Sequence, residues 1–342
     1  MINDKKMKTQ SSNSLQFQLL EKIKNTLPAS SSLVIEISDI LGVSQDSAYR
    51  RLRGETALTI DEVYKLCSQY KISFDALYSH DADTVSFMYQ SLQFNETGFS
   101  GYLHSIYEHL KQINKAPSRQ VVYMAEDLPI FYHFKYPELA AFKLFYWMKS
   151  VMAVPSFEGK KFHASHISDD HIDVCKKIFD SYASVPSVEI WTETTGSSLI
   201  KQIEYFWESG QFQHRDDALF ICEQVRQEFE FIEKQAALSK KLTDEKNISE
   251  NAPEYQLYNC ELELGNNCIL VKMGESKAVY FTHIAFNKLV TTHNSFCNET
   301  EDWMKGMIKK SVLISGTSEK LRYRFFAKAF EQLDILVKAI KN

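Results

Sequence analysis

The chain has 342 residues, of which 44% are hydrophobic, 13% aromatic and 24% charged, and its net charge at pH 7 is −5. This composition is typical of a globular protein with room for roughly two domains, and it excludes a disordered chain and a strongly basic protein. The sequence has no apolar run long enough to span a bilayer, and residues 1–14 lack the apolar core of a signal peptide, so we expect a cytoplasmic protein with no membrane partner.

The first eighty residues predict a compact set of short helices. Residues 14–27 place apolar side chains at a spacing of four on one helical face, and Pro28 stops that helix. Residues 31–42 predict a second helix with an apolar inner face. Gly42 can adopt the left-handed conformation that ends this helix and turns the chain sharply. The turn leads directly into a third helix.

The third predicted helix, residues 45–53, is short and carries its arginines outward. Ser44 is its expected N-cap, and Ala48 and Leu52 face inward. Residues 1–80 carry ten Lys and Arg against nine Asp and Glu, a net charge of +1 that leaves −6 for the rest of the chain. The overall charge is thus a weak signal, and the local placement of the arginines is the informative one.

Two further helices complete the predicted N-terminal bundle. Thr59 and Glu62 have the spacing of a capping box at the start of a fourth helix, and residues 72–78 are expected to close the bundle as a fifth. A helix, a glycine turn and a short arginine-bearing helix form the arrangement that presents one helix to the DNA major groove. The N-terminal region therefore predicts an all-α helix-turn-helix domain.

Residues 37–77 resemble the helix-turn-helix domains of the XRE type (the Cro and phage-repressor class), and more narrowly the BetR-like variant with its Y-R-R-x-R-G-E run, here residues 49–55. In such proteins the residue three after Ala48 is usually apolar, whereas here it is Arg51 and the apolar residue is Leu52. This departure leaves the rotation of the third helix open by about a third of a turn. The other matching positions are Ser38, Leu41, Gly42, Val43, Ser44, Ala48 and Gly54.

The resemblance implies DNA contacts for the exposed residues of the third helix. Ser44 is then a phosphate donor, and Gln45 pairs with an adenine edge. Tyr49 packs on a thymine methyl or a phosphate, and Arg50 or Arg53 reaches a guanine or the backbone. The alternative for each is an ordinary surface side chain. The predicted DNA-binding surface consists of Ser44, Gln45, Asp46, Ser47, Tyr49, Arg50 and Arg53.

One short helix does not supply enough contacts for specific binding. Specific and sequence-neutral binding differ by roughly 4–10 kcal/mol, while a good bidentate base contact contributes about 1–3 kcal/mol. A symmetric homodimer on a two-fold operator doubles the contacts, so we expect a segment beyond residue 80 to dimerise.

The rest of the chain predicts a helical linker and a larger domain. Residues 81–116 form the linker, with two helices separated at Gly98 and Gly101, and residues 117–342 an aromatic-rich α+β domain with a partly antiparallel sheet. A subdivision of this domain near the polar loop 243–254 stays open. The expected elements are strands at 120–125 and 188–193, a buried central helix between Pro137 and Pro155, helices at 197–210 and 216–242, a three-stranded antiparallel meander within 255–283, a helix from about 299, a strand at 311–315 and a helix at 318–340.

The predicted helix 216–242 repeats apolar residues at alternating spacings of four and three. Such a heptad pattern is compatible with two arrangements. In one arrangement the apolar face of this helix forms an intermolecular coiled-coil seam, and in the other it packs on its own domain.

Two further segments have compositions that suggest ligands. Residues 163–173 contain His163, His166 and His171 among aspartates, which is compatible with a metal site or with ordinary loop composition. The pattern lacks helical i, i+4 histidines, and the six cysteines form no C-x-x-C pair, so we expect reduced core thiols and neither a metal nor another cofactor. Between a strand and a helix N-terminus lie four residues that fit an anion site or a simple helix cap: Ser315, Gly316, Thr317 and Ser318.

Together these patterns predict a sequence-specific DNA-binding transcriptional regulator that acts as a homodimer on double-stranded DNA. The large domain is a candidate sensor of an unknown small-molecule effector. The rival class is a protein-interaction or signalling module whose helix-turn-helix has lost DNA contact, and Arg51 and the near-neutral charge favour it. An enzyme is not expected, because the sequence has no Walker loop, nucleophile elbow or dinucleotide fingerprint.

Overall fold

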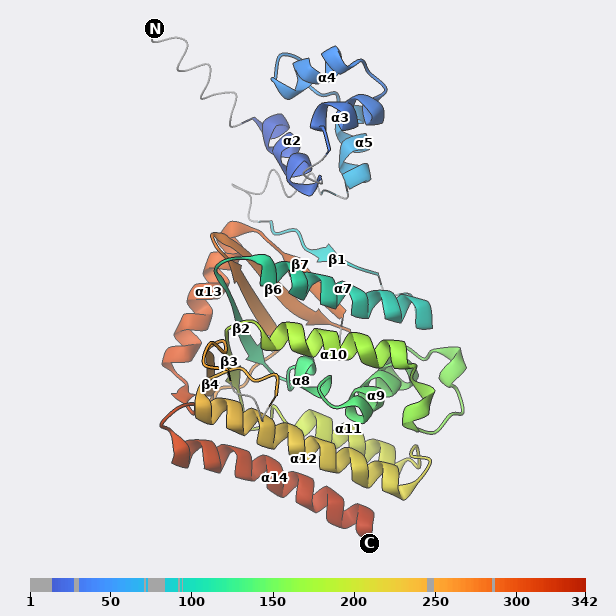
Figure 1. The fold of residues 1–342 in the computed structure, drawn as a ribbon, viewed down its shortest axis with the longest axis vertical. Coiled ribbons are helices and arrows are strands. Elements are labelled where there is room, and N and C mark those ends of the chain that lie inside the picture. Colours follow the sequence, from blue (N-terminus) through green and yellow to red (C-terminus); the bar gives the residue numbers. More distant parts are fainter. Residues whose placement is uncertain are drawn as a thin grey trace. The chain divides into compact units, whose positions relative to one another are not determined.

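The computed structural model describes residues 14–27, 31–70, 72, 84–91, 93, 95–244, 249–284 and 287–342. The chain divides into two compact units, Met1–Ser86 and Phe87–Asn342 (Figure 1). The predictions made for residues 1–13, Pro28, residues 73–78 and residues 245–248 lie outside the described residues.

The first unit contains the predicted short helices. Ser14 Oγ accepts a hydrogen bond from the Phe17 N–H at the start of the first of them, and Gly42, with φ of +65°, ends the second in the left-handed conformation, as predicted. Their apolar faces meet in one core that includes Leu19, Ile37 and Leu66. The described helices of this unit are α2 (Leu15–Thr26), α3 (Leu33–Leu41), α4 (Gln45–Leu52) and α5 (Ile60–Tyr70).

The second unit is built on an eight-stranded mixed sheet with the order β1-β7-β6-β5-β2-β3-β4-β8. Strands β2, β3 and β4 run parallel, and the other pairings are antiparallel. This confirms the expectation of an α+β unit with a partly antiparallel sheet. The strands are β1 (Met88–Tyr89), β2 (Arg119–Ala125), β3 (Ser187–Trp191), β4 (Tyr255–Asn259), β5 (Cys268–Met273), β6 (Ser276–His283), β7 (Asn287–Thr291) and β8 (Val312–Leu313).

Helices cover both faces of this sheet (Figure 1). Helix α13 packs on one face against residues such as Val122 and Val188, while the larger aromatic core on the other face includes Val121 and Tyr123. Neighbouring residues of β2 thus point to opposite faces. The helices are α7 (Glu96–Lys115), α8 (Ile130–His133), α9 (Pro137–Tyr146), the π-helix η1 (Trp147–Val151), the 3₁₀ turns η2 (Pro155–Phe157) and η3 (Ala164–His166), α10 (Asp169–Ala183), α11 (Ser197–Glu208), α12 (Arg215–Leu238), α13 (Asn294–Lys309) and α14 (Glu319–Lys341).

The predicted central helix corresponds to α9 and η1. Every side chain from Leu139 to Phe145 is buried, as predicted for this unusually apolar segment. The six cysteines are free thiols, with Cys67 half-buried and the others buried. None of the helices in the described ranges combines the length and apolar character needed to cross a membrane.

The predicted linker 81–116 is not a separate element. Of its two predicted helices, the second corresponds to α7, which begins earlier than expected, runs through Gly98 and Gly101, packs along α10 and contributes Phe99 to the large core. The first was wrong, because the described residues 84–91 contain strand β1 and no helix. Gly98 does not break the helix. It allows the chain at Gln93 to pack closely against α7, because a Cβ at position 98 would lie 2.5 Å from the Gln93 carbonyl oxygen. The boundary between the units falls near residue 86 instead.

The heptad stripe of α12 packs on its own unit. Ala218, Cys222, Val225, Phe229 and Ile232 are all buried, and α12 lies against α9, α11, α14 and β4 (Figure 1). The stripe is therefore used inside the second unit, so the intermolecular seam was the wrong alternative.

The antiparallel meander is displaced along the chain from its predicted position. It consists of β5, β6 and β7, of which β7 is not among the strands predicted from the sequence. Strand β4 pairs in parallel with β3 and lies away from β5, because β2 and β3 intervene. Apolar alternation marks strands without stating which strands are neighbours.

Candidate nucleic-acid interface

Helix α4 presents a polar, long-armed face to solvent. Gln45, Tyr49 and Arg53 recur at a spacing of four, and all three are exposed, with half of the Tyr49 surface accessible (50%). Ala48 is fully buried on the opposite side. Of the other residues of the predicted DNA-binding surface, Ser44, Asp46 and Arg50 are exposed and Ser47 is half-buried.

The start of α4 is fixed by Ser44. Its Oγ accepts a hydrogen bond from the Ser47 N–H at 3.3 Å and donates to the Ser47 hydroxyl at 3.0 Å. The hydroxyl therefore satisfies one of the free N–H groups at the helix N-terminus. Ser44 has a capping role in the free protein, whatever it contacts in a complex.

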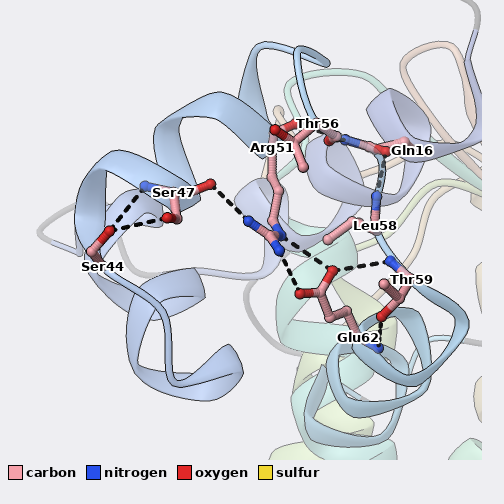
Figure 2. Close-up of polar contacts among 8 residues, drawn as sticks. All are labelled: Gln16, Ser44, Ser47, Arg51, Thr56, Leu58, Thr59 and Glu62. Atoms are coloured by element: carbon pink, nitrogen blue, oxygen red, sulfur yellow. Dashed lines mark hydrogen bonds and ion pairs between the residues drawn. The ribbon is translucent and has the colours of Figure 1, made fainter.

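Arg51, the departure from the family pattern, faces inward rather than toward solvent (Figure 2). Its Nε donates to Glu62 Oε2 at 3.1 Å and its Nη2 to Glu62 Oε1 at 2.7 Å, and Nη1 donates to the Ser47 carbonyl at 3.1 Å. The guanidinium thus occupies the side on which the family has an apolar residue. This orientation fixes the rotation of α4, and the outer face predicted from the sequence is the exposed one.

Glu62 takes part in two contacts, the capping box at the start of α5 and the ion pair with Arg51 of α4. Thr59 Oγ1 accepts from the Glu62 N–H at 3.3 Å and the Thr59 N–H donates to Glu62 Oε2 at 3.0 Å, which confirms the predicted capping box of α5. The hydrogen bonds from Arg51 hold the pKa of the Glu62 carboxyl below its ordinary value. One carboxylate therefore ties α4 to the first turn of α5.

Replacing Arg51 by methionine is expected to lower the free energy of unfolding of the first unit by about 2–3 kcal/mol at pH 7, because Glu62 loses a bidentate partner. The folded-state pKa of Glu62 is lowered, so the contribution is present above the ordinary value of 4.5 and is lost as the pH falls below it. Hydrogen exchange of α4 peptides measures the loss, and the gap between wild type and variant should shrink toward pH 3. Arg50→Met, at an exposed position, is the control. Equal protection of α4 amides in the two variants would contradict a stabilising contact between Arg51 and Glu62.

Gln16, on α2, holds the segment that follows α4 (Figure 2). Its Nε2 donates to the carbonyls of Arg51 at 2.7 Å and Thr56 at 2.9 Å, and its Oε1 accepts from the Leu58 N–H at 2.9 Å. This role of Gln16 was not predicted from the sequence. Its spacing carries no signal, because its partners are backbone groups about forty residues away that only the folded chain brings near.

Glu55 is a second residue that the sequence analysis missed. One of its carboxylate oxygens lies 3.4 Å from Arg53 Nε and the other 3.8 Å from Arg50 Nε, and all three side chains are exposed. The two arginines proposed to contact DNA thus share one acidic neighbour in the free protein. A phosphate or base edge that approached these arginines would have to compete with this carboxylate.

A short helix that follows a glycine turn, buries one side and exposes polar side chains on the other is typical of the class of helix-turn-helix proteins. Residues 15–93 match the BetR domain family, a helix-turn-helix family related to XRE-type regulators, which confirms the resemblance found in the sequence. Neither a curated protein nor a solved structure matches the chain.

The segment predicted as an anion site is engaged within the protein. The Gly316 N–H donates to the Ala236 carbonyl at 2.8 Å, and Ser315 Oγ accepts from the Leu257 N–H at 3.3 Å. Ser318 stands at the N-cap of α14 but its side chain makes no capping hydrogen bond. The loop therefore fastens α14 to α12 and β4, and this geometry favours a structural role.

The histidines of residues 163–173 take part in local contacts. His163 Nδ1 accepts from the Ser165 N–H at 3.3 Å, and His171 Nδ1 lies 2.7 Å from Ser168 Oγ. In the described part of the chain, no group of three or more His, Cys, Asp or Glu side chains is placed to hold a metal ion.

Proposed function

We propose that this chain is a cytoplasmic, sequence-specific DNA-binding transcriptional regulator that acts as a homodimer and whose second unit senses a small ligand. The observation that carries the proposal is the exposed face of α4, where Gln45, Tyr49 and Arg53 project from a helix whose other side is buried and clamped. A rigid helix with long polar side chains is suited to reading base edges.

The homodimer follows from energetics rather than from an observed interface. One α4 helix offers a few base contacts of about 1–3 kcal/mol each, which falls short of the roughly 4–10 kcal/mol that separates specific from non-specific binding. Two copies related by a two-fold axis double the contacts and read a two-fold operator.

The test begins with an unbiased selection of duplexes bound by the full chain. Fluorescence anisotropy on the selected duplex then measures affinity from 50 to 200 mM salt, and sedimentation measures the size of the protein and of its complex. We expect a two-fold consensus, two chains per duplex and an affinity that falls steeply with salt. An affinity indifferent to both duplex sequence and salt would favour the protein-interaction module.

Replacing Glu55 by glutamine is expected to raise DNA affinity roughly three- to tenfold, because the change removes a carboxylate that pairs with Arg50 and Arg53 and repels phosphates. Glu21→Gln is the matched control, since Glu21 forms an ordinary exposed ion pair with Lys24 on α2. Anisotropy at 100 mM salt measures both. An equal gain in the two variants would assign the effect to net charge alone.

The rival interpretation, a module that does not bind DNA, rested partly on Arg51. The structure gives that residue a different role, because it pairs with Glu62 on the inner side of α4. The near-neutral charge of residues 1–80 remains as the observation in its favour. No catalytic step is part of the proposal.

A further inference from the structure

The second unit contains a cavity of about 240 Å³ between α7, the strands β2, β5 and β6, and α9 with η1. A dry cavity of about 150 Å³ is enough to take up benzene, so this space has room for a ring or a short chain with a polar head. Aromatic rings form much of its wall: Tyr102, Tyr123, Phe131, Tyr146, Trp147 and Tyr280.

Lys143, on α9, brings an ammonium group to this apolar wall. The residue is only 5% exposed, and its Nζ donates to Gln202 Oε1 at 2.7 Å and lies 5.3 Å from the centre of the Trp147 ring. Burial lowers the pKa of Lys143 to about 8. An ammonium has three protons to donate, and burying it without a counter-ion is costly. Within the described residues, no carboxylate lies close enough to form an ion pair with it, and Asp127 and Glu228 attract it from a greater distance.

Lys288, on β7, provides a second ammonium group. Its Nζ lies 2.8 Å from His109 Nδ1, and burial lowers the pKa of His109 to about 4, so the imidazole is neutral at pH 7 and can accept. Among the described residues, Asp127 is the one carboxylate residue of the lining. Glu228 lies behind the lining residue His133, with its Oε1 2.8 Å from His133 Nδ1, and attracts Lys143 from there. Among the residues that line the cavity, two lysines against one aspartate leave an excess of one positive charge in a largely apolar space.

We propose that this cavity binds a small apolar molecule that carries one carboxylate, with Lys143 as its ion-pair partner and Lys288 as a second donor. The excess of a single positive charge matches a monoanion, and the aromatic wall matches a hydrocarbon or aryl body. The inference rests on the proposed sensing role of the second unit and names the chemical class of its effector.

Calorimetry on the full chain without DNA tests the assignment. The probes are octanoate and 4-phenylbutyrate, each compared with the alcohol of the same skeleton and with octylamine as a cation. We expect at least one carboxylate to bind at least tenfold more tightly than its alcohol, and octylamine to bind most weakly. Binding of neither carboxylate, or equal binding of each carboxylate and its alcohol, overturns the proposal.

Variants identify the partner of the carboxylate. Lys143→Met is expected to weaken carboxylate binding at least tenfold and to leave the alcohol unchanged, while Lys143→Arg keeps the preference. Lys201→Met is the matched control, because Lys201 is exposed on α11 beside Gln202 and outside the cavity lining. If Lys143→Met behaves like Lys201→Met, the assignment to Lys143 is wrong. DNA binding is measured separately without these probes, so failure of one proposal leaves the other standing.

Discussion

Alanine at both Arg50 and Arg53 is expected to lower the affinity for the selected duplex by about two to three orders of magnitude. Both guanidinium groups are more than half exposed, so a homodimer presents four of them to DNA. At about 1 kcal/mol for each lost contact, the total is about 4 kcal/mol, and competition from Glu55 reduces this figure. If the two arginines contact phosphates, the magnitude of the slope of log affinity against log salt should also fall by about 2–4.

The matched control removes the same charge elsewhere in the first unit. Lys24 and Lys65 are exposed on α2 and α5, and Lys24→Ala/Lys65→Ala should weaken binding only slightly. Both double variants change surface positions, so thermal unfolding should be unchanged to within about 0.5 kcal/mol per substitution. Equal losses of affinity in the two would show that α4 is not the contact surface.

The largest effect on stability is expected at Glu189, on β3, whose side chain is fully buried. Replacing it by glutamine removes the counter-ion of Lys241, which is equally buried and lies 3.1 Å away. An unpaired buried charge costs about 3–5 kcal/mol of unfolding free energy. The groups that donate to the carboxylate are Tyr132, Tyr182, Ser187, Trp191, Lys241 and Tyr255.

Urea unfolding followed by tryptophan fluorescence measures this loss cleanly. All four tryptophans lie beyond residue 86, so the signal reports on the second unit alone. Adding Lys241→Met to Glu189→Gln should recover more than half of the loss, because no charge is then left unpaired. Tyr255→Phe, which removes one donor, should cost only about 1–2 kcal/mol. A loss in Glu189→Gln no larger than in Tyr255→Phe would refute the ion-pair argument.

The candidate DNA interface could be predicted because it is determined locally. The glycine turn at Gly42, the cap at Ser44 and the helical spacing from Gln45 to Arg53 depend on neighbouring residues, and the structure places them as predicted. The rotation of α4 could not be settled, because the partner of Arg51 is on another helix.

The second unit shows where sequence patterns stop being sufficient. An apolar stripe such as that of α12 states that one face is buried, but its partner can be another chain or the same one. The strand order is ambiguous in the same way, because alternating apolar residues indicate a strand but not the strand with which it pairs. Lys143 lies in an apolar helix, and its role depends on Gln202 and on a space formed by distant elements.

Strand β1 is where the chain coming from the first unit joins the sheet of the second. In the described residues it pairs with β7 through Met88 and Tyr89, both exposed, and Asn287 Nδ2 adds a hydrogen bond to the Gln90 carbonyl. The Phe87 ring also packs edge-on against Phe281 and Phe296. β7 also carries Lys288, a member of the cavity wall. Release of β1 would free the backbone as far as Asn95, the N-cap of α7, and lengthen the tether by about 25 Å when extended. That gain is of the same order as the roughly 34 Å between half-sites one DNA turn apart, so in the proposed homodimer the state of this short strand would govern which operator spacings can be reached.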